Sequence, residues 1–286
     1  MNTTAQRWHA QEAPVGHFTV LRALPMHAVQ AVGPFVFLDH FGPFDASPET
    51  LPAHPHAGIE VMTYLLEGAN EHRDSAGHRG IVEAGGAQWM RAGRGILHAE
   101  TNLPHICPTI HGLQIWARLP RAVQHSEPAY RAIAASEVPQ WTVPATQGSG
   151  EVGLRLLGGI FEGRQGPIPL SAPSLLLHVQ LPAASRVALN LPAGSEYGAY
   201  GIDGATRLDG VEAALQRGDF ALLDQTTLVL DNPGAVTSNV LLLGGEAAER
   251  PLVFGGPFVL DSPAALRQAQ RDFYAGKMGT LDGVPF

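Results

Sequence analysis

Four side chains suited to binding a metal ion lie in two short stretches of the sequence. His54 and His56 are two residues apart, and His98 and Glu100 repeat this spacing behind a glycine-rich turn. In a β-strand, residues i and i+2 project from the same face, so each pair can point at one ion. Three imidazoles and one carboxylate favour a catalytic first-row transition metal over a structural zinc site, which more often uses thiolates.

This ligand set also indicates what the ion can do. It leaves about two positions open on a six-coordinate ion, enough for a substrate oxygen, dioxygen or water. We expect one divalent transition metal as the cofactor, with Fe(II) as the first choice. Cu, Ni, Co, Mn and Zn stay open, because affinities of such sites follow the Irving–Williams order and occupancy depends on supply.

The histidines are concentrated in the first half of the chain. Twelve of the thirteen lie between His9 and His125, and only His178 follows. Histidine chemistry is therefore expected in the first half alone. Five other histidines of that half lack a partner at ligand spacing, and we expect ordinary polar roles for them: His72, His78, His105, His111 and His125. Asp74 and Ser75 are expected to close a turn.

The elements around these residues are predicted to be short strands. In the first half, apolar runs such as Val61–Leu66 and Gly112–Ala117 recur at intervals of about ten residues with Gly and Pro between them. This pattern is typical of an antiparallel sandwich or jelly roll. Pro55 lacks an amide hydrogen, so we expect it at the start of a strand or where the ladder is interrupted.

The second half of the chain is predicted to be β-rich too. Strand-like runs resume with Gly153–Leu157 and Ser174–Leu181. A Pro-, Gly- and Ser-rich stretch, residues 138–150, is the candidate linker between a first domain at 1–137 and a second at 151–286. A weak internal repeat aligns the four candidate metal ligands with Asn190, Pro192, Leu230 and Asn232. The second domain is therefore expected to be a copy without a metal site.

One helix is predicted, near the end of the chain. Ser262 is a suitable N-cap, Pro263 suits the first helical position, and Gly276 would end the helix. Leu266, Ala269 and Phe273 share one face. We expect this apolar stripe to dock on the surface of the protein itself.

Composition excludes several classes of function. The 286 residues carry a formal net charge of -8 with no basic run, which argues against direct binding of nucleic acid or of an anionic membrane. Residues 1–13 have no apolar signal region, and no segment approaches the roughly 20 apolar residues of a membrane span. With a lone Cys107, which cannot form an internal disulfide, this predicts a soluble, unexported, cytoplasmic protein.

Several motifs together resemble one known family. They comprise Val32-Gly33-Pro34-Phe35, Leu38-Asp39-His40-Phe41-Gly42-Pro43, the segment from His54 to Gly68, His72-Arg73-Asp74-Ser75-Ala76-Gly77, Gln88-Trp89-Met90, Ala92-Gly93-Arg94-Gly95-Ile96 and His98-Ala99-Glu100. The chain resembles the pirins of the cupin superfamily. The likeness covers most of the first half and fades in the second until Gly256-Pro257-Phe258-Val259.

The resemblance implies a fold and a ligand set. The fold is an all-β bicupin, with two antiparallel β-sandwich domains, a short C-terminal helix and a metal site in the first domain only. The metal ligands of the family map onto His54, His56, His98 and Glu100. Many other cupins instead use a glutamate four residues after the second histidine, which here is Glu60. The pirin likeness favours Glu100.

The resemblance also implies a function. Pirin-like proteins are similar to quercetin 2,3-dioxygenases, which cleave a flavonol with dioxygen and release carbon monoxide. Glu100 would then be both metal ligand and catalytic proton acceptor, and the partners would be a small aromatic substrate and O2. The alternative is an iron-dependent regulatory protein whose oxidation state controls binding of a protein partner.

Overall fold

The computed structural model describes residues 6–16, 18–26, 28–48, 50–148, 150–281 and 283. Antiparallel sheets make up most of the described chain, which confirms the predicted all-β class. Among these residues, no helix has the length and apolar character needed to cross a membrane.

The chain divides into two compact units that do not follow the order of the sequence. The first, here called the histidine unit, comprises Pro14–Val20, Phe35–Glu137 and the described part of Ala248–Phe286. The second, the companion unit, comprises the described part of Met1–Ala13, Leu21–Pro34 and Val138–Ala247. Each unit therefore includes a segment from the opposite end of the chain, unlike the predicted division into 1–137 and 151–286.

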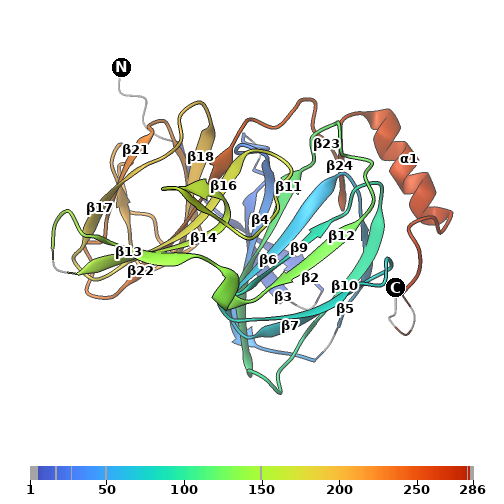
Figure 1. Cartoon of the computed structure of the whole chain (residues 1–286), viewed down its shortest axis with the longest axis horizontal. Coiled ribbons are helices and arrows are strands. Elements are labelled where there is room, and N and C mark those ends of the chain that lie inside the picture. Colours follow the sequence, from blue (N-terminus) through green and yellow to red (C-terminus); the bar gives the residue numbers. More distant parts are fainter. Residues whose placement is uncertain are drawn as a thin grey trace. The chain divides into compact units, whose positions relative to one another are not determined.

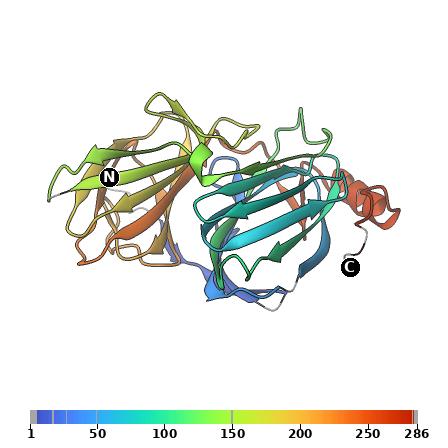
Figure 2. The ribbon, with the colours of Figure 1, turned by 60° about the horizontal axis from the view of Figure 1, so that its bottom comes forward.

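The histidine unit is a sandwich of two sheets (Figures 1 and 2). The larger has the order β12-β9-β6-β11-β4-β3-β2 and the smaller the order β5-β10-β7-β8. The bounds are β2 Gln11–Val15, β3 Phe18–Leu24, β4 Phe35–Asp45, β5 Thr50–His56, β6 Ile59–Glu67, β7 Ala69–Asp74, β8 Arg79–Glu83, β9 Ala87–Arg91, β10 Ile96–Asn102, β11 Thr109–Arg118 and β12 Ala129–Ile133, followed by a short 3-10 helix at Ala135–Glu137. The unit boundaries fall inside β2 and β3.

The companion unit is also built from two sheets. The larger has the order β1-β20-β18-β22-β16-β14-β13, with β15 paired to β14, and the smaller has the order β17-β21-β19. The bounds are β1 Arg7–His9, β13 Gln140–Pro144, β14 Glu151–Phe161, β15 Arg164–Gln165, β16 Ser174–Leu181, β17 Arg186–Asn190, β18 Glu196–Asp203, β19 Arg207–Leu208, β20 Asp219–Leu223, β21 Thr227–Asp231 and β22 Ser238–Gly245.

The stretch proposed as a linker is partly a strand. Gln140–Pro144 form β13, which pairs along its whole length with β14 at the edge of the larger companion sheet. An edge strand tolerates Pro144 because one side of it needs no amide donors. The composition of residues 138–150 was therefore misleading, since the same Pro and Thr residues suit a sheet edge.

Apolar side chains form the core of the companion unit. The pair β17 and β21 buries Val187, Leu189, Leu228 and Leu230 in one core cluster with β16 and β22. Asn190 pairs with Thr227 rather than with Leu230, so the repeat offsets do not reproduce the register of β5 and β10. His178 is buried there and bonds to Asn239.

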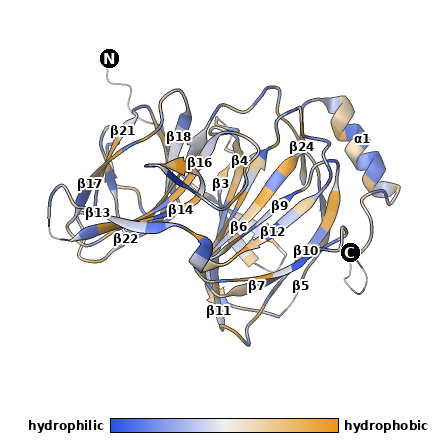
Figure 3. Cartoon of the chain, viewed as in Figure 1, coloured by the Kyte–Doolittle hydropathy of each residue, from blue (hydrophilic) through white to orange (hydrophobic). Residues whose placement is uncertain are grey.

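The C-terminal segment packs on the histidine unit. It forms β23 Val253–Gly255, β24 Phe258–Leu260 and α1 Pro263–Tyr274, with Ser262 as N-cap as predicted. Helix α1 carries both hydrophilic and hydrophobic residues (Figure 3). Its buried face, with Leu266, Ala269 and Phe273, packs against a cluster that includes Ala57 and Leu97. The predicted docking is therefore confirmed, but on the unit of the first half.

Candidate metal centre

The predicted pairs of metal-binding residues lie on neighbouring strands. β5 carries His54 and His56, β10 carries His98, and His54 is the direct cross-strand partner of His98. Pro55 lies near the end of β5 rather than at its start. Because β5 is an edge strand, the missing amide hydrogen of Pro55 costs no ladder bond. Of the two positions predicted for Pro55, the start of a strand is therefore not the one observed.

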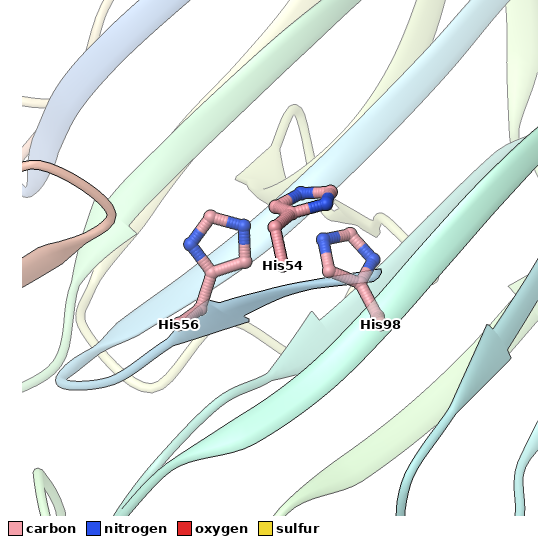
Figure 4. A group of neighbouring side chains, drawn as sticks. All are labelled: His54, His56 and His98. Atoms are coloured by element: carbon pink, nitrogen blue, oxygen red, sulfur yellow. The ribbon is translucent and has the colours of Figure 1, made fainter. Parts of the chain in front are cut away.

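The three imidazoles converge on one point (Figure 4). One potential ligand atom from each of His54, His56 and His98 lies within 4.8 Å of the others, and the ring centroids are 4.3 to 5.0 Å apart. His56 and His98 are each 1% exposed. In the part of the chain that the structure describes, this is the one group of three or more such residues.

Hydrogen bonds at the outer nitrogens leave the inner nitrogens available. Nδ1 of His54 lies 2.9 Å from the carbonyl of Pro52, and Nδ1 of His56 lies 3.0 Å from that of Pro257. A carbonyl only accepts, so each Nδ1 carries the proton and each Nε2 keeps its lone pair. The Nε2 atoms of His56 and His98 are buried without a hydrogen-bond partner. Buried polar atoms need a partner, so these residues fit a metal ion.

The C-terminal segment supplies part of this arrangement. Pro257 stands just before β24, where Phe258 bridges to Ala57 and the amide of Val259 donates to the carbonyl of Ala57 at 3.2 Å. Gly58, with φ +77°, permits this approach, because a Cβ there would collide with the Val259 carbonyl oxygen. A residue 201 positions away in the sequence thus orients a ligand.

Burial keeps His56 and His98 neutral. Desolvation, followed by repulsion from His54, lowers the pKa of His56 to about 3 against the weaker raising effect of its bond to Pro257. Desolvation, followed by repulsion from His54, His56 and His72, holds the pKa of His98 well below 6.5. Neutral imidazole is the form that binds metal, so His56 and His98 need no deprotonation at neutral pH.

Glu100 lies on β10 but outside the three-histidine group. Its side chain is buried, and its Oε1 accepts hydrogen bonds from Oγ1 of Thr63 at 3.1 Å and from the side-chain amide of Gln88. Both hydrogen bonds go to Oε1, so they hold the carboxylate, and with it Oε2, in one orientation. The role of Glu100 as fourth ligand and proton acceptor remains a prediction.

Glu60 lies on the other face of β6. Thr63 bonds to Glu100 between the two sheets, and residues 60 and 63 have opposite parity in a strand. Glu60 is fully buried there, and its Oε1 accepts a hydrogen bond from the Trp89 indole at 3.1 Å. This position favours Glu100 over Glu60 as the carboxylate near the histidines.

Two further residues, which the sequence did not single out as candidates for the site, lie next to the centre. His72 and Asp74 lie on β7, beside β10, where His72 is the cross-strand partner of Glu100 and Asp74 that of His98. Nε2 of His72 lies 3.1 Å from Oδ2 of Asp74, and its Nδ1 lies 3.4 Å from Nδ1 of His98. The available signal was the His-x-Asp spacing, the same i, i+2 pattern that singled out the other pairs.

Asp74 also closes the predicted turn. Its Oδ1 accepts from the amides of Ala76 and His78, both at 3.0 Å, and its carboxylate also bonds to the His78 ring. Burial alone would raise the pKa of Asp74, but hydrogen bonds from His72 and His78 outweigh burial and lower it. The carboxylate is therefore ionised and acts as an acceptor.

An aromatic pair lies next to the histidines. Trp116 on β11 presents its ring edge to His56 at 4.9 Å and stacks on Phe37 of β4 at 3.9 Å. The indole Nε1 of Trp116 is buried without a hydrogen-bond partner. Trp89 on β9 and Met62 on β6 have the same parity as Glu60, so they face away from Thr63.

Comparison with known proteins gives matches over both halves. The family model described as Pirin matches residues 17–117, and the Pirin C-terminal cupin domain matches residues 176–279. A pirin-like protein from Caulobacter vibrioides is 35% identical over 90% of this chain and 91% of its own. Pirin from Rattus norvegicus is 32% identical over 91% of this chain and 87% of its own.

A solved structure agrees with these matches. A quercetin 2,3-dioxygenase from Acinetobacter baumannii superimposes with a TM-score of 0.87 at 27% identity, covering 96% of this chain and 97% of its own. The sequence matches, the two cupin units and the converging histidines lead to one conclusion: the chain belongs to the pirin family.

Proposed function

We propose that this protein is a metal-dependent dioxygenase of the quercetin 2,3-dioxygenase type, acting on a flavonol-like aromatic substrate. The observation that carries the proposal is the convergence of three imidazoles beside an aromatic pair, with the Nε2 atoms of His56 and His98 buried and without a hydrogen-bond partner. The similarity to the Acinetobacter baumannii quercetin 2,3-dioxygenase supports the choice of reaction.

His54, His56 and His98 would hold the ion, with Glu100 as the proposed fourth ligand. A bound divalent ion would supply Lewis acidity that lowers the pKa of a substrate hydroxyl. Fe(II) remains our proposed ion, and the imidazole and carboxylate donors also suit Cu, Ni, Co, Mn and Zn.

Glu100 is the proposed acceptor for the substrate hydroxyl proton. Thr63 and Gln88 both donate to Oε1, which holds the carboxylate in place and leaves Oε2 as the atom that would accept the proton. A positioned carboxylate of this kind contributes to general base catalysis without moving during the reaction.

Trp116 and Phe37 are the proposed binding surface for the flat substrate. Stacked aromatic rings offer a large apolar area, and the unpartnered indole N–H of Trp116 can donate to a substrate oxygen. A flavonol has both an extended aromatic plane and several oxygen acceptors, so it matches this surface chemically.

The test is anaerobic loading of the protein with each candidate ion, followed by quercetin and dioxygen. We expect loss of the flavonol absorbance with one carbon monoxide released for each flavonol consumed. Protein carrying His56→Ala, treated in the same way, is the matched control for reaction at free metal. If no ion supports either signal, the dioxygenase proposal is wrong, and the regulatory alternative gains weight.

A further inference from the structure

The ligand His98 is the inner end of a buried hydrogen-bonded chain. Its Nδ1 lies 3.4 Å from Nδ1 of His72, and Nε2 of His72 lies 3.1 Å from Oδ2 of Asp74. The side chains of His72 and Asp74 are 1% and 0% exposed. The chain therefore runs from β10 through β7 without contact with solvent.

Asp74, at the outer end of this series of hydrogen bonds, determines which atom donates at each step. An ionised carboxylate only accepts, so Nε2 of His72 donates to Asp74, and Nδ1 of a neutral His72 is left as an acceptor. Nδ1 of His98 must then donate to it. This tautomer leaves the lone pair of His98 on Nε2, the buried atom without a partner in the three-histidine group.

Both outer groups are held in place. Asp74 accepts from two backbone amides and the His78 ring in addition to His72. The His72 ring stacks on Tyr130 of β12 with centroids 4.1 Å apart and planes 7° from parallel. The Tyr130 hydroxyl donates to Gln88 at 3.3 Å, and Gln88 in turn donates to Glu100.

We propose that His72 and Asp74 are positioning residues that fix the tautomer and orientation of His98 and thereby set the affinity of the centre for its ion. The inference rests on the metal-binding part of the proposed function and not on turnover. Outer hydrogen bonds of this kind orient metal-binding histidines in general and raise their basicity.

The sharpest variant is Asp74→Asn. The amide oxygen of an asparagine can still accept from the amides of Ala76 and His78, so the turn is kept. Its NH2 group, however, faces His72 as a donor where the carboxylate accepted. His72 then accepts at Nε2 and carries its proton on Nδ1. Because metal binding through Nε2 of His98 requires a proton on Nδ1 of His98, two N–H donors would face each other between His72 and His98.

We expect Asp74→Asn to bind Co(II) about 10- to 100-fold more weakly than the unaltered protein. The measurement is titration of metal-free protein with Co(II) against a competing chelator, without substrate. The visible spectrum of bound Co(II) should shift, because the His98 ligand is displaced. Two-bond 1H–15N NMR of the Zn(II)-loaded protein should show Nδ1 protonation of His98 in the unaltered protein and its loss in the variant.

A second variant removes the chain but keeps its packing. His72→Phe retains a planar ring against Tyr130 and deletes both nitrogens, so a purely structural role would survive it. We expect the same loss of Co(II) affinity. This variant also keeps the proposal testable if Asp74→Asn lowers the yield of folded protein.

Two substitutions serve as matched controls. His78→Gln removes a ring that bonds to Asp74 from a side chain 37% exposed, but leaves the link from Asp74 to His72 intact. Asp219→Asn makes the same chemical change in the companion unit, at a carboxylate paired with Arg7. Both should bind Co(II) with the affinity and spectrum of the unaltered protein.

The proposal is overturned if Asp74→Asn and His72→Phe both fold and bind Co(II) with unaltered affinity and spectrum. It is also overturned if the two control variants, His78→Gln and Asp219→Asn, weaken Co(II) binding as much as Asp74→Asn and His72→Phe do. If the unaltered protein binds the ion but does not consume flavonol, the dioxygenase proposal is wrong. The positioning role proposed for His72 and Asp74 is unaffected by that result.

Discussion

His54 and His98 are direct partners across the antiparallel pair β5 and β10, and their ring centroids lie 4.3 Å apart. A cross-strand pair on one face brings side chains into contact without help from a loop. His56, two residues along β5, joins them on the same face. The geometry of the centre is therefore a property of two paired strands, and four predictions follow from it and from its surroundings.

Replacement of His98 by alanine should abolish stoichiometric metal binding. The ligand group loses one of its three imidazoles, and the remaining two cannot compensate at fixed strand positions. Elemental analysis after dialysis against a trace of metal measures the loss. His178→Ala is the control, because His178 is equally buried but bonds to Asn239 in the companion unit. Equal metal content in both variants would contradict the assignment.

Replacing each of the two buried glutamates by glutamine should have different effects on metal binding and turnover. Glu100→Gln should lower metal affinity and flavonol turnover, because the neutral amide is a poorer ligand and proton acceptor. Glu60→Gln should preserve both, since its amide oxygen can still accept from Trp89 on the opposite face of β6. Metal content and carbon monoxide release are measured for each. The assignment is wrong if Glu60→Gln loses the ion and Glu100→Gln retains it.

Trp116→Leu should raise KM for quercetin while leaving metal content unchanged. Loss of the aromatic partner removes about 0.5 to 1.5 kcal/mol of stacking energy, equivalent to binding that is about 2- to 13-fold weaker. Steady-state kinetics with the metal-loaded protein provide the measurement. Trp89→Leu, a matched change on the opposite face, should not raise KM. An unchanged KM in Trp116→Leu would remove this ring from the proposed substrate surface.

His178 should make the metal-free protein less stable in acid. Burial lowers its folded-state pKa to about 4, against the raising effect of its bond to Asn239, while the unfolded value is near 6.5. The unfolded chain therefore takes up a proton first as the pH falls. The contribution of neutral His178 is complete above about pH 6.5 and is lost as the pH falls to 4, amounting to about 3 kcal/mol.

Urea unfolding of metal-free protein between pH 7 and pH 4 tests this effect. The difference in unfolding free energy between the original protein and His178→Gln should shrink or reverse over that window, because glutamine does not titrate. Subtracting the two curves cancels the contributions of the other histidines. A constant difference across the window would show that His178 does not titrate as described.

The sequence alone was enough to predict most of the strands, the helix and the three histidines that converge. Side-chain parity in a strand and the capping of a helix are local properties, so His54, His56, His98 and Ser262 could be assigned from spacing and residue type. The concentration of histidines in the first half likewise placed the centre in one unit.

The tertiary structure decided everything that depends on distant segments. It placed Gln140–Pro144 in a sheet, moved the C-terminal helix onto the histidine unit and put Glu60 on the face away from the histidines. It also brought the Pro257 carbonyl to His56 and the His72–Asp74 pair to His98. Strand neighbours and hydrogen-bond acceptors are chosen by long-range pairing and packing, which local spacing does not encode.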